Sequence, residues 1–417
     1  MSETSTVVVG GGLAGIAAAL RLSDAGHRVV LLEKRPRLGG AAFSFMRGDL
    51  SIDNGQHVFL RCCTAYQWFL ARVGARDKVV LQSRLDIPVL SPDGRSARLR
   101  RTSRVPAPAH LGAALASYGV LGAGDRVRAA RGALALRRLD PADPTLDMRT
   151  LGSYLRAHGQ NDATIDALWG IIATATLNID PDEASLALAA KVFRTGLLDT
   201  ADAGDVGHAA VPLSRIHEDA AAKALANAGV EVLLDTGVRS VTPDGRVETD
   251  SANGARRFDC DGVVLAVPPS DAFAVAPELT SSRAARAQQL GTSPIVNVHV
   301  IYDRKVTDLP FAAAVRSPVQ WFFDRTESSG LAAQRPNAQY LAITVSAATD
   351  VIDRPTRAVL DKFVPALSQL LPVAQRAEIV DAFVTRERQA TFRQAAGTAA
   401  LRPGAGDGPD EIGRAHV

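Results

Sequence analysis

The sequence predicts an α/β protein in which a parallel sheet is interleaved with a second, α+β domain. Three observations lead to this prediction. Short β-branched segments at 6–9 and 28–33 flank an Ala- and Leu-rich segment at 13–25, which is the pattern of a strand–helix–strand unit. The 34 glycines suit close packing of backbone against backbone. At 417 residues the chain is longer than one simple core allows, which favours two domains.

Composition excludes several classes of protein. The net charge is only +3, and the 47 lysines and arginines are spread along the chain, whereas a nucleic-acid binder carries a dense basic face. The three cysteines, Cys62, Cys63 and Cys260, lack metal-ligand spacing and give no disulfide framework, so we expect no metal site. No segment approaches the roughly 20 apolar residues that span a bilayer, and we find no signal peptide, so we expect a cytoplasmic protein.

The predicted elements after this first unit follow in a simple order. A loop-rich stretch from 35 to 66 contains a glycine pair and an Asp-Asn-Gly turn signal. A mostly helical stretch from 105 to 198 comes next and is punctuated by prolines. Beyond it the pattern favours strands at 230–234, 237–241, 262–267, 295–302, 320–324 and 340–345, a helix at 357–371 and a strand at 379–386.

The turn after the first strand carries the clearest functional signal. Residues 10–15 fit G-x-G-x-x-G: Gly10 permits the tight turn, Gly12 lets the backbone approach a pyrophosphate, and Gly15 lets helix and strand pack closely. Free N–H groups at the helix N-terminus then meet the phosphates. Glu33 closes the second strand, where a carboxylate accepts a hydrogen bond from a ribose 2′-hydroxyl and repels a 2′-phosphate. These features predict a Rossmann-like site for FAD or NAD rather than NADP.

A resemblance favours FAD over NAD. Residues 35–40, Arg-Pro-Arg-Leu-Gly-Gly, resemble the R-x-G-G extension of the amine oxidase and carotenoid desaturase flavoproteins, which runs along the FAD pyrophosphate towards the flavin. Residues 230–238 resemble the strand of that superfamily that contacts adenine, and 262–269 resemble its VVLAVPP crossing between domains. The candidate cofactor-binding residues are therefore Gly10, Gly12, Leu13, Ala14, Gly15, Glu33, Lys34, Arg35, Gly39, Gly40 and Val238.

The resemblance also implies the domain organisation. We expect a Rossmann-like FAD-binding domain of the glutathione-reductase and amine-oxidase type, interleaved with an α+β substrate domain. The expected segments are 1–85 (FAD-binding domain, first segment), 86–204 (helical part of the substrate domain), 205–270 (FAD-binding domain, second segment), 271–385 (sheet part of the substrate domain) and 386–417 (a truncated return to the FAD-binding domain).

The run at 53–57, Asp-Asn-Gly-Gln-His, narrows the resemblance. Together with Leu213 and the segment 388–392, it resembles the squalene-associated FAD-dependent desaturases, whose members act as hydroxysqualene dehydroxylases in bacterial hopanoid synthesis. The resemblance runs from residue 4 to about 404. It implies reductive removal of a hydroxyl from hydroxysqualene, giving squalene and water, with reduced FAD as the hydride donor.

This run also supplies the candidate catalytic residues. His57 is the candidate proton donor because the ordinary pKa of histidine lies near neutrality, and Gln56 and Asn54 are candidates for orienting flavin or substrate. Asp-Asn-Gly is also a turn signal, and on that interpretation His57 only satisfies a loop carbonyl. The electron donor that reduces FAD and the oligomeric state do not follow from the sequence.

Three alternative functions stay open. A phytoene-type carotenoid desaturase uses the same fold with oxidised flavin. A soluble-substrate amine oxidase usually carries aromatic residues beside the flavin, and the three Trp and five Tyr of this chain offer few. An inactive, truncated flavoprotein-like fragment is the third, because the closing A-G-D-W segment of the superfamily is missing before 405–417, a tail that we expect to be artefactual.

The substrate implied by the resemblance is a hydrophobic isoprenoid that lives in membranes, so we expect peripheral contact with the inner face of the cell membrane. The segment 111–121 suits an interfacial helix whose apolar face lies in lipid. The alternative is an internal helix pair of the substrate domain with a solvated basic side. Five arginines follow the segment and suit either interpretation: Arg126, Arg128, Arg131, Arg137 and Arg138.

Overall fold

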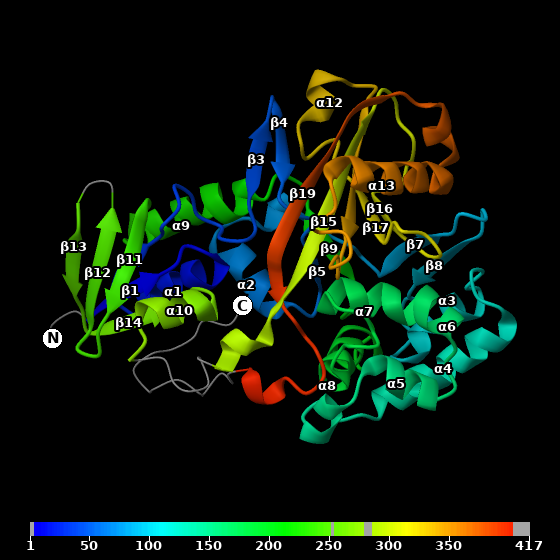
Figure 1. Cartoon of the computed structure of the whole chain (residues 1–417), viewed down its shortest axis with the longest axis horizontal. Coiled ribbons are helices and arrows are strands. Elements are labelled where there is room, and N and C mark those ends of the chain that lie inside the picture. The colour runs from blue at the N-terminus through cyan, green and yellow to red at the C-terminus, as the bar shows by residue number, and fades with distance from the viewer. Residues whose placement is uncertain (1–3, 252–253, 279–285, 403–417) are drawn as a thin grey trace.

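The computed structural model describes residues 4–251, 254–278 and 286–402. Figure 1 shows two parts. The part at the left carries a parallel sheet and a small antiparallel sheet, and the part at the right carries a large sheet with helices above and below it. Strands from early and late segments of the chain pair within both parts, so the predicted interleaved α/β fold is confirmed.

The parallel sheet contains the predicted strand–helix–strand unit. β1 (Ser5–Val9) and β2 (Arg28–Leu32) pair in parallel, and α1 (Leu13–Asp24) connects them. Two strands from much later in the chain, β10 (Glu231–Leu233) and β14 (Gly262–Leu265), complete the order β10-β2-β1-β14. Because all four strands are parallel, their carboxyl ends meet at one edge, where the turn after β1 lies beside the residue after β2.

Hydrophobic clusters cover both faces of this sheet. On one face Val8 packs with Ile16 and Leu20 of α1 and with α9 (Ala221–Asn227). On the other face Val7 and Val9 pack against α10 (Pro269–Val275) and the small antiparallel sheet. Successive residues of β1 therefore point to opposite faces, and both faces are apolar, as a buried parallel strand requires.

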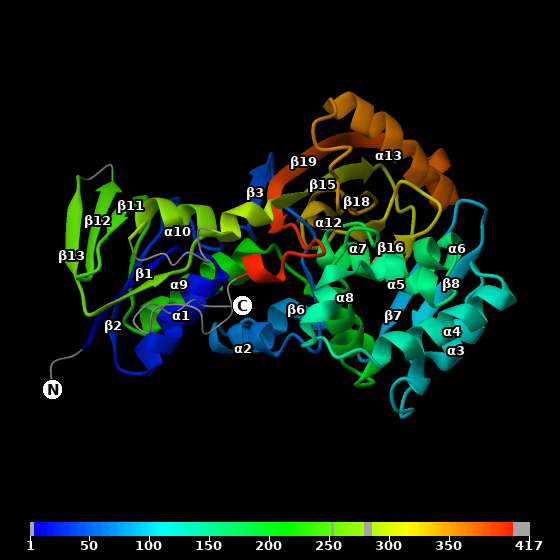
Figure 2. The ribbon, with the colours of Figure 1, turned by 60° about the horizontal axis from the view of Figure 1, so that its bottom comes forward.

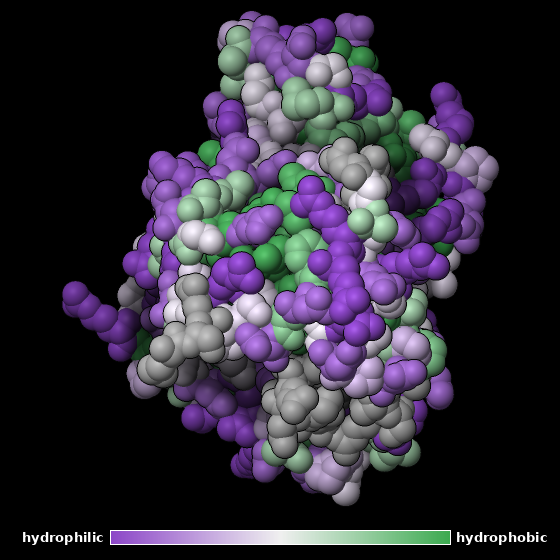
Figure 3. Space-filling model, turned by 90° about the vertical axis from the view of Figure 1, so that its left-hand side faces the viewer, coloured by the Kyte–Doolittle hydropathy of each residue, from purple (hydrophilic) through white to green (hydrophobic). Residues whose placement is uncertain are grey.

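The small antiparallel sheet contains two strands that the sequence pattern did not reveal. The sheet consists of β11 (Thr236–Val241), β12 (Arg246–Ser251) and β13 (Arg256–Asp259). Only the first of these was predicted. The other two are rich in charged residues and expose most of them, so they lack the apolar run that marks a buried strand. Figure 3 views the molecule from this end and shows hydrophobic side chains in a hollow between hydrophilic ones.

The large sheet has seven strands in the order β19-β15-β18-β17-β16-β7-β8. Helix α13 (Thr356–Leu370) buries Val359, Phe363 and Leu367 against one face. The predicted segments correspond to α13, β15 (Thr292–Tyr302), β17 (Trp321–Asp324), β18 (Gln339–Val345) and β19 (Ile379–Phe392). The remaining strands are β16 (Phe311–Ala314), β7 (Asp86–Leu90) and β8 (Ser96–Arg100).

The helical part packs against the β7 end of this sheet, and Figure 2 shows its helices together at the right. Its principal helices are α3 (Gly112–Ala116), α4 (Ala123–Arg137), α5 (Leu151–Ala157), α7 (Gly170–Leu177) and α8 (Leu186–Phe193). The segment 86–204, expected to be the helical part of the substrate domain, begins with strands. The β7–β8 hairpin occupies 86–100 and pairs with β16, a partner more than 200 residues away that no local pattern reveals.

The interfacial-helix interpretation of 111–121 was also wrong. Tyr118, Val120 and Leu121 are fully or almost fully buried in the core of the helical part, and the Tyr118 hydroxyl donates to the Ala167 carbonyl at 2.8 Å. The apolar residues needed for lipid contact therefore face the protein interior. Within the described residues, no helix has the length and apolar character needed to cross a bilayer.

Short strands occupy the predicted loop-rich stretch and join the two parts. β3 (Ser44–Arg47) and β4 (Leu50–Asp53) form a hairpin. β5 (Val58–Leu60) and β6 (Val79–Leu81) pair with opposite edges of β9 (Val206–Ala209). Strands of three or four residues are too short to show a hydrophobic period, and such distant partners leave no local signal in the sequence. They place the ends of β4, β5 and β9 close together.

The last described residues lie against the helical part. β19 continues to Phe392, beyond the predicted boundary at 385. Ser185 N–H then donates to the Gln394 carbonyl at 3.0 Å, and Gly397 N–H donates to the Asp147 carbonyl at 2.6 Å. The domain boundaries at 85, 204, 270 and 385 remain a prediction, and the tail at 405–417 lies outside the described residues.

Candidate functional site

The turn after β1 is shaped by close contacts that exclude side chains. Gly10 has φ +106°, and a Cβ there would lie 2.5 Å from the Ala266 carbonyl oxygen. A Cβ on Gly15 would lie 1.8 Å from the Gly10 carbonyl oxygen. These two glycines therefore serve the tight turn and the close packing of helix against strand, as their spacing predicts.

Gly12 differs because the space beside it is open. It has φ −75°, and the nearest atom to a Cβ would be Cα of Gly40 at 3.7 Å. Gly12 is the N-cap of α1 and no side chain caps the helix, so the N–H groups of the first turn, including those of Leu13 and Ala14, have no intrahelical partner. The turn thus offers open space and free donors at a positive helix end, which fits a pyrophosphate.

Glu33 lies at the neighbouring strand end and is buried, with 6% of its surface exposed. Its Oε2 accepts from Gly11 N–H at 2.7 Å, and its Oε1 accepts from Arg35 N–H at 2.9 Å. A carboxylate offers about four acceptor positions, so two remain for ribose hydroxyls. The Glu33 carbonyl also accepts from Thr236 N–H at 2.9 Å, which brings β11 and its Val238 beside this edge.

The glycine pair packs directly on the first turn. Gly39 and Gly40 have φ of +94° and +57°, and a Cβ on Gly40 would lie 2.8 Å from Cα of Gly12. Arg35 and Arg37 each donate from Nη1 to the Gly40 carbonyl at 3.1 Å. The extension therefore packs against the glycine turn and extends the open backbone surface that begins there.

Arg37 is a residue that the sequence reasoning missed. Burial lowers the pKa of its guanidinium, with the Arg35 charge adding to the effect, and its guanidinium carbon lies 3.6 Å from the centre of the Phe43 ring. The signal was present, because R-x-G-G spacing before Gly39 places the motif arginine at 37 rather than 35. Lys34, by contrast, pairs with Asp271 at 3.1 Å on the surface, with 62% of its side chain exposed.

Asn54 connects this extension to the run at 53–57. Its side-chain amide donates to the Ala41 carbonyl at 2.8 Å, and its side-chain oxygen accepts from Phe43 N–H at 3.1 Å. The Asn54 carbonyl accepts from the Asn297 side chain at 3.1 Å. These backbone contacts give Asn54 a role in positioning the loop, and its role towards flavin or substrate remains a prediction.

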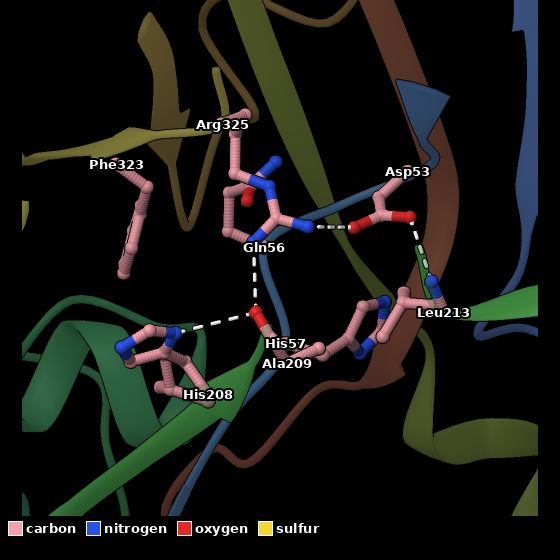
Figure 4. A pocket seen from close by; sticks show the side chains of 9 residues that line it. Asp53, Gln56, His57, His208, Ala209, Leu213, Phe323 and Arg325 are labelled. Atoms are coloured by element: carbon pink, nitrogen blue, oxygen red, sulfur yellow. Dashed lines mark hydrogen bonds and ion pairs between the residues drawn. The ribbon is translucent and has the colours of Figure 1, made fainter. Parts of the chain in front are cut away.

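A small polar cavity lies directly after this loop (Figure 4). Its centre is a buried ion pair between Arg325, which follows β17, and Asp53 at the end of β4. Asp53 also accepts from Leu213 N–H at 3.0 Å and from the Ser44 hydroxyl at 2.7 Å. The cavity is lined by Asp53, Gln56, His57, Val58, His208, Ala209, Leu213, Phe323 and Arg325.

The ion pair joins the two parts of the molecule. Arg325 also donates to the Ala209 carbonyl at 3.3 Å, at the end of β9. Asp53 and Arg325 thus tie the large sheet to β4, β9 and the loop before α9. Arg325 carried no sequence signal, because it follows a short strand with no motif around it, and its partner is 272 residues away in the chain.

His57 lies on the open side of this cavity. The residue is exposed, yet the surrounding protein removes enough water to lower the pKa of its imidazole, opposed by the charge of Asp53 and aided by that of Arg325. Its ring makes no hydrogen bond to a described residue, so the interpretation that it only satisfies a loop carbonyl finds no support. The lowered pKa disfavours the protonated imidazole, which suits the relay of a proton better than its storage.

Two further histidines have partners that the sequence did not reveal. His208 lines the cavity, and its Nδ1 lies 3.3 Å from the Ala209 carbonyl, so the proton lies on Nδ1. Burial lowers the pKa of His208. His217 is buried between the Tyr66 hydroxyl at 2.9 Å and the Ala42 carbonyl at 3.0 Å, and burial lowers its pKa to about 4.

The fold and the site together define a class of protein. A parallel sheet whose first turn presents free N–H groups beside a buried carboxylate fits an adenine dinucleotide. A polar cavity lies beside the chain that follows the glycine pair. Residues 13–412 match the family model described as flavin containing amine oxidoreductase, and the chain belongs to that family. It is an FAD-dependent oxidoreductase, as predicted.

Curated relatives cover almost the whole chain. It is 28% identical over 413 residues to a hydroxysqualene dehydroxylase of Rhodopseudomonas palustris, covering 97% of this chain and 90% of that one. A hydroxysqualene dehydroxylase of Sinorhizobium fredii is 26% identical, with 95% and 88% covered. A 15-cis-phytoene desaturase of Narcissus pseudonarcissus is 24% identical, with 88% and 66% covered.

Solved structures share the fold. An oxidoreductase from Methanosarcina mazei matches with a TM-score of 0.72 and 15% identity, covering 98% of this chain and 93% of that one. The cyclohexylamine oxidase of Brevibacterium oxydans matches with a TM-score of 0.65 and 16% identity, covering 99% and 92%.

Proposed function

We propose that this protein removes the hydroxyl group of hydroxysqualene reductively, giving squalene and water, within hopanoid or triterpenoid synthesis. The named activities of two near full-length relatives support a flavin oxidoreductase that acts on an isoprenoid. The observation that carries the finer proposal is the polar cavity around Gln56 and His57. Removing a hydroxyl requires partners for an oxygen atom, whereas desaturating a hydrocarbon does not.

The residues of the first turn bind the cofactor in this proposal. N–H groups of Gly12, Leu13 and Ala14 would hold the pyrophosphate, and Glu33 would accept from the ribose. Arg37 and the Gly39–Gly40 pair line the path towards the flavin. Reduced FAD, when bound, supplies the hydride that replaces the hydroxyl group.

The cavity residues act on the leaving oxygen. Asp53 and Arg325 fix the loop that carries Gln56 and His57, and apolar neighbours such as Phe323 keep bulk water away. The carbon–oxygen bond breaks, and its electron pair goes to oxygen. His57 relays one proton from solvent to this oxygen, which leaves as water. The reaction consumes two electrons, which an external donor would supply through the cofactor.

The test is product analysis with two substrates. FAD-loaded protein, reduced chemically without oxygen, is incubated with hydroxysqualene, and oxidised protein is incubated with phytoene. We expect squalene from the first and unchanged phytoene from the second. New double bonds in phytoene, with no squalene formed, would establish the rival function instead.

A phytoene-type desaturase remains the second candidate function. The relative from Narcissus pseudonarcissus supports it over 381 residues, although at lower identity and coverage than the dehydroxylases. Its reaction would leave the buried amide of Gln56 in the cavity without a partner, which is why we favour the dehydroxylase.

We also propose peripheral contact with the inner face of the membrane through α4 rather than 111–121. Val127 and Leu134 are 53% and 48% exposed, and they are seven residues apart on one face of the helix. Arg128, Arg131 and Arg138 are exposed close to them, which suits anionic headgroups. Sedimentation with phosphatidylglycerol vesicles should fall in R131E/R138E, while equal binding of this variant would exclude the contact.

A further inference from the structure

The cavity beside the Asp53–Arg325 pair contains one buried donor without an acceptor. Nε2 of Gln56 is shielded from solvent and makes no hydrogen bond to any described residue. A buried amide N–H without a partner is costly and uncommon in folded proteins. Nε2 therefore points to an acceptor that the protein chain itself does not supply.

Apart from His57, which is exposed to solvent, the other donors among the cavity's side chains already have partners. Arg325 donates to Asp53 and to the Ala209 carbonyl, and His208 donates from Nδ1 to the same carbonyl. Figure 4 shows these side chains gathered around Ala209. Gln56 is thus the donor left over, and the missing occupant must accept a hydrogen bond from it.

The size of the cavity limits that occupant. The space open to the centre of a water molecule is about 10 Å³, which is close to the least that holds one ordered water. A phosphate, a carboxylate or a ring does not fit. His57 and Val58 on its rim are exposed, so a single atom carried by a larger molecule can reach the cavity from that side.

We infer that this cavity is a site for one oxygen atom, held by Nε2 of Gln56. In the resting protein the occupant is an ordered water. The next step rests on the proposed function. During turnover, the occupant is first the hydroxyl oxygen of the substrate and then the water formed from it. Gln56 therefore distinguishes a hydroxylated isoprenoid from the hydrocarbon of the same length.

The first test does not depend on activity. Gln56→Met keeps the length of the side chain and removes the donor, and Gln375→Met serves as a control because that amide lies on the surface, bonded to the Ser368 carbonyl at 3.2 Å. In FAD-loaded protein we expect a high-resolution crystal structure to show a water beside Nε2 of Gln56, and the Tm of Q56M to be equal to or below that of the control. A dry cavity, or a Tm of Q56M above both wild type and control, would overturn the inference, because removing an unpaired buried amide stabilises a protein.

The second test measures selectivity. With reduced, FAD-loaded enzyme, Q56M should lower kcat/KM for hydroxysqualene about tenfold or more, as expected for loss of a buried hydrogen bond, while the Ki of squalene as an inhibitor stays unchanged. An equal loss for both ligands would overturn the inference. If wild type does not convert hydroxysqualene at all, the proposed function fails, and the oxygen site is then decided by the crystal structure and the Tm alone.

Discussion

Two glycines of the same turn differ in what a methyl group would meet. A Cβ on Gly15 would collide with the Gly10 carbonyl oxygen at 1.8 Å, whereas a Cβ on Gly12 would meet only Cα of Gly40 at an ordinary 3.7 Å. The backbone at Gly12 is in a region that any residue adopts, with φ −75° and ψ 177°. Packing explains Gly15, whereas no contact within the protein excludes a side chain at Gly12, so the space beside it is available to a ligand.

This contrast gives the first prediction. Gly12→Ala should fold with a Tm near that of wild type without cofactor but bind FAD at least about tenfold more weakly, because the methyl occupies space that the pyrophosphate needs. Gly15→Ala should instead lose stability before any cofactor is added. Thermal melts of apoprotein and titration with FAD measure both effects. Equal FAD affinity in Gly12→Ala and wild type would contradict the assignment of the turn.

A second prediction at the residue scale concerns Asp53 and Arg325. Their side chains are only 4% and 10% exposed, so removing one partner leaves a buried charge. Arg325→Met should destabilise the protein by about 3–5 kcal/mol. Adding Asp53→Asn should restore part of that loss. Urea unfolding of the two single variants and the double variant gives the coupling energy, and purely additive effects would show that the pair does not act as a unit.

Among the elements, β1, α1 and β2 were predictable because every signal for them lies within 33 residues: a β-branched run, a glycine turn and a closing carboxylate. The cavity was not predictable as a whole. Gln56 and His57 stood out in a motif, but β9 pairs with β5 across about 150 residues, and Arg325 arrives from the large sheet. Distant pairing of short strands leaves no local periodicity, so the sequence suggested part of the cavity lining and not its arrangement.

The segment after β19 depends on one carboxylate for its position. Asp147 is 3% exposed and accepts from the Ser185 hydroxyl, Ala399 N–H and Arg402. Burial raises its pKa, but these three partners outweigh burial and lower it overall. Asp147 thus holds 397–402 against α8.

The third prediction follows at this element scale. Asp147→Asn should cost about 1–3 kcal/mol of stability and should raise amide hydrogen exchange selectively in 394–402. Asp140→Asn, at an exposed loop aspartate in the same part, serves as the control. Unchanged exchange in 394–402 would refute the role of Asp147.

For the whole molecule, buried histidines set the response to acid. Burial lowers the pKa of His217 to about 4 and that of His299 to about 3, from an ordinary value of 6.5. Below about pH 6.5 the unfolded chain therefore binds protons at these histidines that the folded chain does not bind. The contribution of the two histidines to stability is fully present above that pH. It is lost as the pH falls towards their pKa values in the folded protein.

The fourth prediction gives this loss a size. Between about pH 6 and pH 5, each of these histidines should remove roughly 1 kcal/mol of stability. His217→Gln should be less stable than wild type at pH 7, yet its stability should fall less steeply with pH. Urea unfolding at several pH values measures the slopes, and identical slopes for variant and wild type would exclude His217 as a contributor.

The central claim is that the bound flavin and the polar cavity together replace a hydroxyl with hydride. The most direct measurement is a single turnover without oxygen, in which FAD on the protein is first reduced and hydroxysqualene is then added. We predict that the flavin absorbance returns to that of the oxidised form and that one squalene appears for each flavin oxidised. Flavin that stays reduced, or that is oxidised without squalene being formed, would contradict the account.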